Sequence, residues 1–381
     1  MLRLSLNLLA AVAGLFLADP IPARAEAQAG VASANDTARV LAGLPPSPGS
    51  PLEAVTREPG WQKHAKSFDA EWANLTTRQL SKTRAWSEAN LGESRATLFY
   101  MFSGPDFLYA DSFFPSASTY VMSGLEPVGR LPDLMSIKPG QLPQVLGDLK
   151  ASLSDVLSRS YFITSHMDQK LRRGQLAGVL PVLYVFLART GKTIEDVSYV
   201  TLQPDGTLKP FEASTPPTAP KAVKIAFKSK EGRDQTLYFF STNLSNKGVA
   251  ESGFLKFCES LGTGDAFVKS ASYLPHGSEF VTVREFITSQ ARILQDDTGP
   301  PLRVYRESEW RLQAFGVYTR PIPPFNNSYQ PAMKALFDKQ KPKPLGFSYG
   351  YRWRNDQSHM LLATRLTPQA SDQTGQGGQS K

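Results

Sequence analysis

Cysteine is nearly absent from this sequence, whose 381 residues include only Cys258. A single cysteine cannot form an internal disulfide, so burial of a core must hold the fold, and the chain is long enough for that. Histidine is also scarce, and its four residues lie too far apart for the closely spaced ligand pairs of zinc sites. The sequence therefore excludes a disulfide scaffold and disfavours zinc, while carboxylate ligands for other metals can still meet from distant segments.

No apolar run is long enough to span a bilayer, which takes about 20 residues. The apolar run at 4–17 instead follows Arg3 and precedes an Ala-x-Ala site that ends at Ala25. This pattern is typical of a cleavable secretory signal peptide. We therefore predict a signal peptide over 1–25 with cleavage near Ala25, and a periplasmic or secreted protein with no transmembrane segment after cleavage.

Long runs of charge of one sign are missing as well. The formal net charge is +8, and removing residues 1–25, which hold two arginines and one aspartate, leaves +7. Because the basic residues are scattered, they are typical of a solvated surface, and we expect no nucleic-acid ligand. The partners left open are an anionic envelope component and a protein partner.

Composition divides the rest of the chain into three parts. Proline, alanine, glycine and serine dominate 26–56, where we predict a flexible arm. The polar stretch 367–381 is predicted to be a disordered tail. Residues 57–366 are predicted to form a single α/β domain, with a helical insertion at about 135–190 and a β-rich C-terminal extension.

One stretch, 97–130, organises the prediction of the fold. It consists of a strand, a Ser-Gly-Pro-Asp loop, a short helix and a second strand that ends before Glu126. Residues 236–298 repeat this alternation as β-α-β-α-β, and strands joined by helices favour parallel, right-handed crossovers. We therefore predict an α/β fold with a Rossmann-like, mainly parallel sheet.

Ligands of open α/β sheets bind outside the carboxyl ends of the strands, so the residues that follow each predicted strand are the candidates for a site. They are four candidate catalytic carboxylates, Asp106, Glu126, Asp296 and Asp297, and four candidate ligand-binding residues, Ser103, Gly104, Asn243 and Tyr273. Each also has an ordinary structural explanation, such as a first-turn charge for Asp106 or a turn at 296–299. If all the strands are parallel, the eight residues gather along one edge of the sheet.

The segments FSGPDFLYA, GLEPVG and LQDDTG resemble an uncharacterised family of exported bacterial proteins. This resemblance implies export and brings no activity with it. The strand-Gly-Pro-helix-strand-Glu run is also distantly similar to the first βαβ unit of class I methyltransferase-like folds, which are Rossmann-like. The glycine-rich loop of that fold is missing, since SGPD holds one glycine, so no cofactor is carried over and the cofactor stays unknown.

Three functional hypotheses follow. The first is an envelope or periplasmic binding or accessory protein with a polar site at the strand carboxyl ends. The second is a hydrolytic enzyme that uses the clustered carboxylates. The third is a structural partner-binding protein that uses an aromatic hairpin predicted over 346–366, where aromatic residues alternate with polar ones. No stretch identifies a reaction, so the sequence leaves open whether the protein is an enzyme.

Overall fold

The computed structural model describes residues 32–158, 176–213 and 218–366. One compact unit begins at Ala32. The predicted signal peptide and polar tail lie outside the described residues, as does the middle of the predicted helical insertion.

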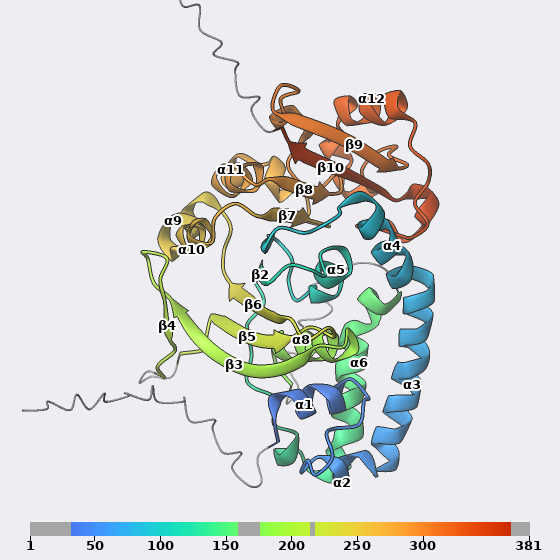
Figure 1. Ribbon diagram of the computed structural model, residues 1–381, viewed down its shortest axis with the longest axis vertical. Coiled ribbons are helices and arrows are strands. Elements are labelled where there is room, and N and C mark those ends of the chain that lie inside the picture. Colours follow the sequence, from blue (N-terminus) through green and yellow to red (C-terminus); the bar gives the residue numbers. More distant parts are fainter. Residues whose placement is uncertain (1–31, 159–175, 214–217, 367–381) are drawn as a thin grey trace, which may run out of the picture. The chain divides into compact units, whose positions relative to one another are not determined.

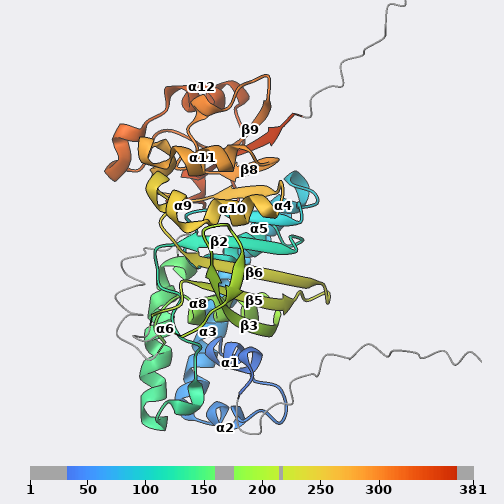
Figure 2. The same cartoon turned by 90° about the vertical axis from the view of Figure 1, so that its left-hand side faces the viewer.

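A mixed sheet of ten strands runs through the described part of this unit (Figures 1 and 2). The strands are β1 (Thr97–Tyr100), β2 (Thr119–Gly124), β3 (Thr193–Leu202), β4 (Leu208–Pro210), β5 (Ala222–Lys228), β6 (Asp234–Ser241), β7 (Asp265–Val268), β8 (Arg292–Gln295), β9 (Trp310–Gly316) and β10 (His359–Arg365). Their order is β4-β3-β5-β6-β2-β1-β7-β8-β10-β9. The α/β class is therefore confirmed.

The prediction of a mainly parallel sheet is wrong. The five central strands β6, β2, β1, β7 and β8 are parallel, which gives four parallel pairs. Five further pairs are antiparallel, because β3, β4 and β5 extend one edge and β9 and β10 extend the other. The pairs β3–β4 and β5–β6 have short hairpin connections and are antiparallel, whereas β1 and β2, β6 and β7, and β7 and β8 are each joined through helices.

Helices cover both faces of the sheet (Figures 1 and 2). The described α-helices are α1 (Ala34–Leu41), α2 (Glu53–Thr56), α3 (Pro59–Leu75), α4 (Ser81–Asn90), α5 (Phe107–Phe113), α6 (Leu142–Ser158), α8 (Leu180–Arg189), α9 (Asn246–Ser252), α10 (Phe254–Ser260), α11 (Val281–Thr288) and α12 (Pro331–Gln340). Alternate residues of β1 enter two separate cores, with Leu98 and Tyr100 on the side of α1, α3, α5, α6 and α8. Phe99 faces the core that α9 to α12 cover, as the two-residue period of a strand requires.

Residues 32–56 are packed, which corrects the prediction of a flexible arm for the described part of 26–56. The side chain of Ser33 caps α1 by accepting a hydrogen bond from the Asp36 amide at 3.0 Å. Val40 and Leu41 are fully buried in the core, and the Trp61 indole donates to the Val40 carbonyl at 2.9 Å. A short alanine-containing helix thus lies against the apolar helix α8, and the domain starts near residue 32 instead of residue 57.

The two described ends of the predicted insertion are helical, as expected. They are α6 and α8, and α8 is buried on all sides from Leu180 to Ala188, with a proline in its first turn. That environment suits a helix that is apolar all round. Among the helices of the described residues, none combines the length and apolar character needed to cross a membrane.

The aromatic hairpin predicted over 346–366 is wrong, although β9 and β10 do extend the sheet beyond β8. Within this range only His359–Arg365 forms a strand, and its antiparallel partners are β8 and β9. Phe347 and Tyr349 are buried, whereas Trp353 is 67% exposed, so these aromatic side chains do not share one face. Ser358 fixes the irregular segment, because its hydroxyl accepts from the Tyr349 amide at 2.9 Å and donates to the Arg354 carbonyl at 2.8 Å.

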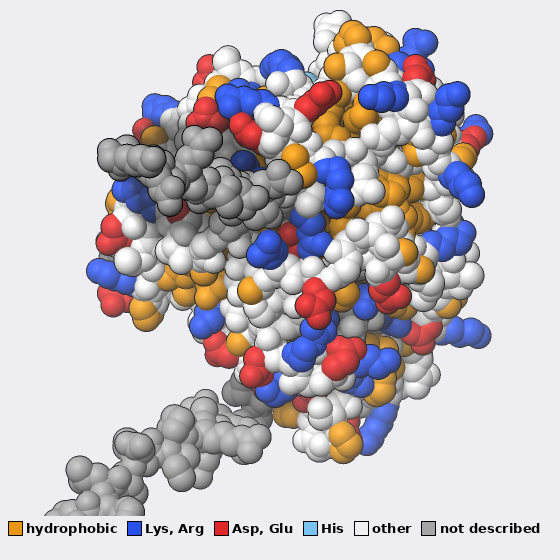
Figure 3. Space-filling model, turned by 45° about the horizontal axis from the view of Figure 1, so that its top comes forward, with side chains coloured by type: hydrophobic (Ala, Val, Ile, Leu, Met, Phe, Trp, Pro, Cys, Tyr) orange, Lys and Arg blue, Asp and Glu red, His pale blue; other side chains and the backbone are white. Residues whose placement is uncertain are grey.

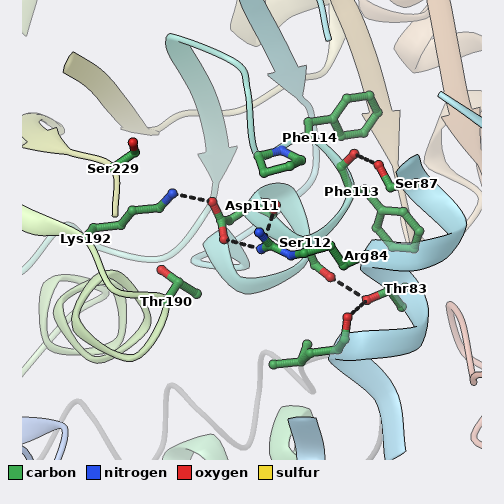
Figure 4. A network of polar contacts seen from close by, with 12 residues as sticks. Thr83, Arg84, Ser87, Asp111, Ser112, Phe113, Phe114, Thr190, Lys192 and Ser229 are labelled. Carbon is green, nitrogen blue, oxygen red and sulfur yellow. Dashed lines mark hydrogen bonds and ion pairs between the residues drawn. The ribbon is translucent and has the colours of Figure 1, made fainter. Parts of the chain in front are cut away.

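A buried polar network fastens α5 to its neighbours (Figure 4). The carboxylate of Asp111 pairs with Arg84 of α4 at 2.9 Å and with Lys192, just before β3, at 2.7 Å. The Ser87 hydroxyl donates to the carbonyl of Phe113 at the end of α5. These contacts join α4, α5 and the start of β3, and none of the five residues lines the cavity described next.

Candidate functional site

A cavity of about 490 Å³ lies at the carboxyl ends of β1, β2, β6 and β7. The loops after these strands meet because the strands are parallel. Of the eight residues predicted to gather here, five line the cavity: Ser103, Gly104, Asp106, Glu126 and Asn243. The cavity therefore occupies the edge of the sheet that the sequence indicated.

The cavity also lies where the order of the central strands reverses. From β1 the chain continues to β2, which lies on the side of β1 away from β7. From β7 it continues to β8, which lies on the side of β7 away from β1. The loops after adjacent strands β1 and β7 therefore diverge and leave a crevice between them. This is the position at which open α/β sheets bind their ligands.

The innermost charged groups of the cavity are Asp106 and Lys269. Lys269 Nζ lies 2.8 Å from Asp106 Oδ2 and 3.9 Å above the ring centre of Tyr109. The Tyr100 hydroxyl donates to the same oxygen at 2.8 Å, and the Tyr109 amide donates to Asp106 Oδ1 at 3.3 Å, which caps α5. Both partners of the ion pair are almost completely buried.

Lys269 is not among the site residues predicted from the sequence, because it interrupts an apolar run instead of following one. Strand β7 ends at Val268. The available signal was a single charge within an otherwise apolar run. In a buried parallel strand such a charge marks either the strand end or a functional group.

Burial dominates the electrostatics of this pair. It lowers the pKa of Lys269, although attraction to Asp106 opposes the shift. It raises the pKa of Asp106, although Lys269 and Tyr100 oppose that shift. Both shifts favour the neutral forms of the two groups, because the pair is removed from water.

The backbone around the cavity is strained. Five non-glycine residues of the described chain have a positive φ, and four of them follow β1 or β7: Phe102, Ser270, Ser272 and Tyr273, with φ between 51° and 60°. All but Tyr273 line the cavity. Such conformations cost about 1–3 kcal/mol each, and they cluster at functional sites.

Contacts from two other parts of the chain hold the strained segment 270–273. Asp296 Oδ2 accepts from the Ser270 amide at 2.9 Å, and Thr298 Oγ1 accepts from the Ala271 amide at 2.8 Å. The hydroxyl of Tyr351 donates to the Ser270 carbonyl at 2.7 Å and lies 2.7 Å from the Ser272 hydroxyl. The wall after β7 is therefore fastened by the turn after β8 and by the C-terminal segment.

Three of the predicted site residues, Tyr273, Asp296 and Asp297, lie behind this wall and do not line the cavity. Asp297 accepts from the Tyr273 hydroxyl at 2.6 Å, and its other oxygen lies 3.1 Å from His359 Nε2. Burial acts to raise the pKa of Asp297, but His359 and Tyr273 more than offset it, and the pKa is lowered. For Asp296, burial and the neighbouring Asp297 raise the pKa.

The remaining predicted residues form the side of the cavity near β2. The Ser103 hydroxyl is engaged with backbone, since it accepts from the Ser123 amide at 3.1 Å and donates to a carbonyl. Glu126 packs against Gly124, where an added Cβ would lie 2.1 Å from Glu126 Oε2. Asn243 Oδ1 accepts from the Ser245 amide at 2.9 Å. Ser103 thus fastens the loop after β1 to β2, which is a structural role.

The outer end of the cavity is apolar. Leu125 is 76% exposed and Leu274 is 38% exposed, and both line the cavity. Phe102 and Phe280 contact each other edge to face beside them, with ring centres 5.9 Å apart. A ligand would therefore meet apolar side chains at the mouth and polar, charged groups at the inner end.

Within the described residues, no group of three or more His, Cys, Asp and Glu side chains is arranged to hold a metal ion. Comparisons with protein-family models, curated proteins and solved structures found no match to this chain. The function has to be argued from the cavity itself.

Proposed function

We propose that this protein is an exported, periplasmic or secreted, binding or accessory protein that holds a small organic molecule in the cavity between the loops after β1 and β7. The observation that carries the proposal is the cluster of strained residues on the cavity wall. Strain of this kind persists only where the surroundings enforce it, and here Asp296, Thr298 and Tyr351 do so.

The ion pair between Asp106 and Lys269 supports the same proposal. A buried ion pair is weak evidence for stability, because the loss of hydration offsets the attraction between the charges, and this pair occupies the inner end of the cavity. Buried charges that stability does not explain are candidates for functional groups. Position, strain and buried charge therefore coincide at one place in the fold. That place is also a switch point between parallel strands, which supports a Rossmann-like relationship for the central strands.

The two alternative functions have less support. Hydrolysis by clustered carboxylates needs several of them at the cavity, but Asp296 and Asp297 lie behind its wall, and Asp106 already accepts three hydrogen bonds or ion-pair contacts. A partner surface on the C-terminal aromatic residues would rest on Trp353 and the half-buried Tyr351, since Phe347 and Tyr349 are buried.

A specific anionic envelope partner also has little support on the face of the molecule that Figure 3 draws. Figure 3 shows Lys and Arg side chains interspersed with Asp and Glu on the face that it draws. Mixed charge of this kind favours solubility over the binding of a polyanion.

A thermal-shift screen tests the proposal, and a matched pair of variants localises any ligand. The mature protein is screened against metabolites, sugars and cell-wall fragments, and a ligand at 100 times its Kd should stabilise it by about 2.7 kcal/mol. Leu125→Trp should narrow the mouth of the cavity and abolish the shift, whereas Leu131→Trp should preserve it. Leu131 is also exposed but does not line the cavity. The absence of any stabilising compound, or equal shifts in both variants, would refute the proposal.

A further inference from the structure

Two lysines of the described chain are buried, Lys269 and Lys192. Both pair with a buried aspartate, at 2.8 Å for Lys269 with Asp106 and 2.7 Å for Lys192 with Asp111. Lys269 and its partner line the cavity, whereas Lys192 and its partner do not, and Asp111 also pairs with Arg84. Lys192 therefore serves as an internal control, since it is also buried and paired with an aspartate but lies away from the cavity.

We propose that Lys269 binds carbonyl compounds covalently, its amine forming an imine with an aldehyde or ketone that carries an apolar group. The inference rests on the proposed function, since it takes the cavity to be the ligand site. A lysine in a partly apolar pocket beside a proton acceptor is the arrangement that activates an amine for attack on a carbonyl carbon.

The neighbours of Lys269 meet the needs of this chemistry. An amine attacks only when it is neutral, and burial shifts the pKa of Lys269 in that direction. Asp106 Oδ2, 2.8 Å from Nζ, is placed to take the proton, and burial raises the pKa of this carboxyl. The Tyr100 hydroxyl, hydrogen-bonded to the same oxygen at 2.8 Å, fixes the acceptor in place.

The step balances without any other reactant. The ammonium proton of Lys269 passes to Asp106, and the freed nitrogen lone pair forms a bond to the carbonyl carbon while the carbonyl π electrons move to oxygen. Asp106 returns its proton to that oxygen, which gives a carbinolamine. The nitrogen of this carbinolamine still carries two protons. One of them leaves with the hydroxyl as water, which leaves a protonated C=N bond beside the Asp106 carboxylate. No atom is oxidised or reduced overall.

The cavity also defines the class of carbonyl compound. Leu125 and Leu274 at the mouth suit an apolar substituent, which would extend outward from the reacting carbon. The carboxylate of Glu126 lines the cavity as well, and the charge of Lys269 is already compensated by Asp106. We therefore expect a neutral aldehyde or ketone to be preferred over a carbonyl compound that carries a carboxylate.

Reductive trapping tests the inference on the folded mature protein. The protein is incubated with hexanal and sodium cyanoborohydride at pH 7, and peptide mapping by mass spectrometry follows the alkylation of each lysine with time. We expect alkylation of Lys269 to be several-fold faster than that of Lys192 and than that of an exposed lysine such as Lys256. Glyoxylate, an anionic aldehyde, should label Lys269 more slowly than hexanal does.

Asp106→Asn removes the group that protonates the carbonyl oxygen and should slow alkylation of Lys269 several-fold, even though Lys269 then loses its proton more easily, while alkylation of Lys256 stays unchanged. If this variant does not fold, the comparison of Lys269 with Lys192 in the unaltered protein decides the question alone. The inference is overturned if Lys269 is alkylated no faster than Lys192, because transient unfolding would expose both.

The outcomes separate this inference from the proposed function. If compounds stabilise the protein, Leu125→Trp abolishes that stabilisation and Lys269 is not alkylated preferentially, the covalent chemistry is refuted and the proposed ligand binding still stands. Fast alkylation of Lys269 that Leu125→Trp suppresses would support both. No stabilising compound and no preferential alkylation would refute both.

Discussion

The Asp106–Lys269 ion pair makes a quantitative prediction about stability, which a double-mutant cycle can measure. Asp106→Asn leaves an ammonium group buried beside a neutral amide. Removing one partner of a buried pair typically costs about 3–5 kcal/mol. We expect the lower end, about 3 kcal/mol, because Lys269 can lose its proton, as the direction of its pKa shift indicates.

Lys269→Met should cost less, about 1–2 kcal/mol. Methionine fills a similar volume, and Asp106 keeps hydrogen bonds from the Tyr100 hydroxyl and the Tyr109 amide. In the double variant neither charge remains, so its stability should lie close to that of Lys269→Met alone. The expected interaction energy between the two sites is therefore about 3 kcal/mol, the cost of Asp106→Asn alone.

Urea unfolding at pH 7, followed by circular dichroism, gives the free energy of unfolding of all four proteins. The m value must stay constant across the set, so that shifts in midpoint report stability. If the two single changes add in the double variant to within about 0.5 kcal/mol, the groups do not interact as a buried ion pair. The structural basis of the proposed site would then be refuted.

Two further changes test the support of the cavity wall and the packing of the N-terminal residues. The pKa of Asp297 is lowered in the folded state, so its carboxylate contributes stability that is present above its unfolded-state pKa of about 4 and is lost as the pH falls through the lower folded value. Asp297→Asn should therefore lower the free energy of unfolding at pH 7 and weaken its dependence on pH below about 4. Urea unfolding over a pH series measures both effects. If the variant loses as much stability in acid as the unaltered protein does, the prediction is contradicted. Leu41→Ala, at a fully buried position, should cost about 2–5 kcal/mol, whereas Leu131→Ala at an exposed position should cost under about 0.5 kcal/mol. If urea titration shows that the two changes lower the free energy of unfolding equally, residues 32–56 do not pack on the domain and form a flexible arm.

The central strands could be predicted from sequence because they are buried on both faces. Such strands are nearly continuous apolar runs, and β1, β2, β6, β7 and β8 each gave that signal between helical segments. Their parallel pairing then followed from the crossovers. This is why five of the eight candidate residues, which were chosen only by their place after a strand, line one cavity.

Local patterns carried much less information about the outer strands and the packed N-terminal segment. Residues 32–56 have the composition of a linker, and α1 becomes stable only by packing on α8, a helix more than 100 positions away. Lys269 was missed because the end of a four-residue strand cannot be located from an apolar run alone. The alternating aromatic residues of 346–358 matched a strand, but hydrogen bonds to Ser358 fold that segment into a compact loop.

The C-terminal extension is best understood as part of the site. It brings Tyr351 to the strained residues Ser270 and Ser272, and it brings His359, the first residue of β10, to Asp297. At Gly350 an added Cβ would lie 2.2 Å from Asp296 Oδ2, so the segment packs directly on the carboxylate that holds the Ser270 amide. Strained backbone keeps its conformation only while such contacts persist. The segment between β9 and β10 therefore has a consequence beyond the sheet, because it fixes the shape of the cavity wall formed by the loop after β7.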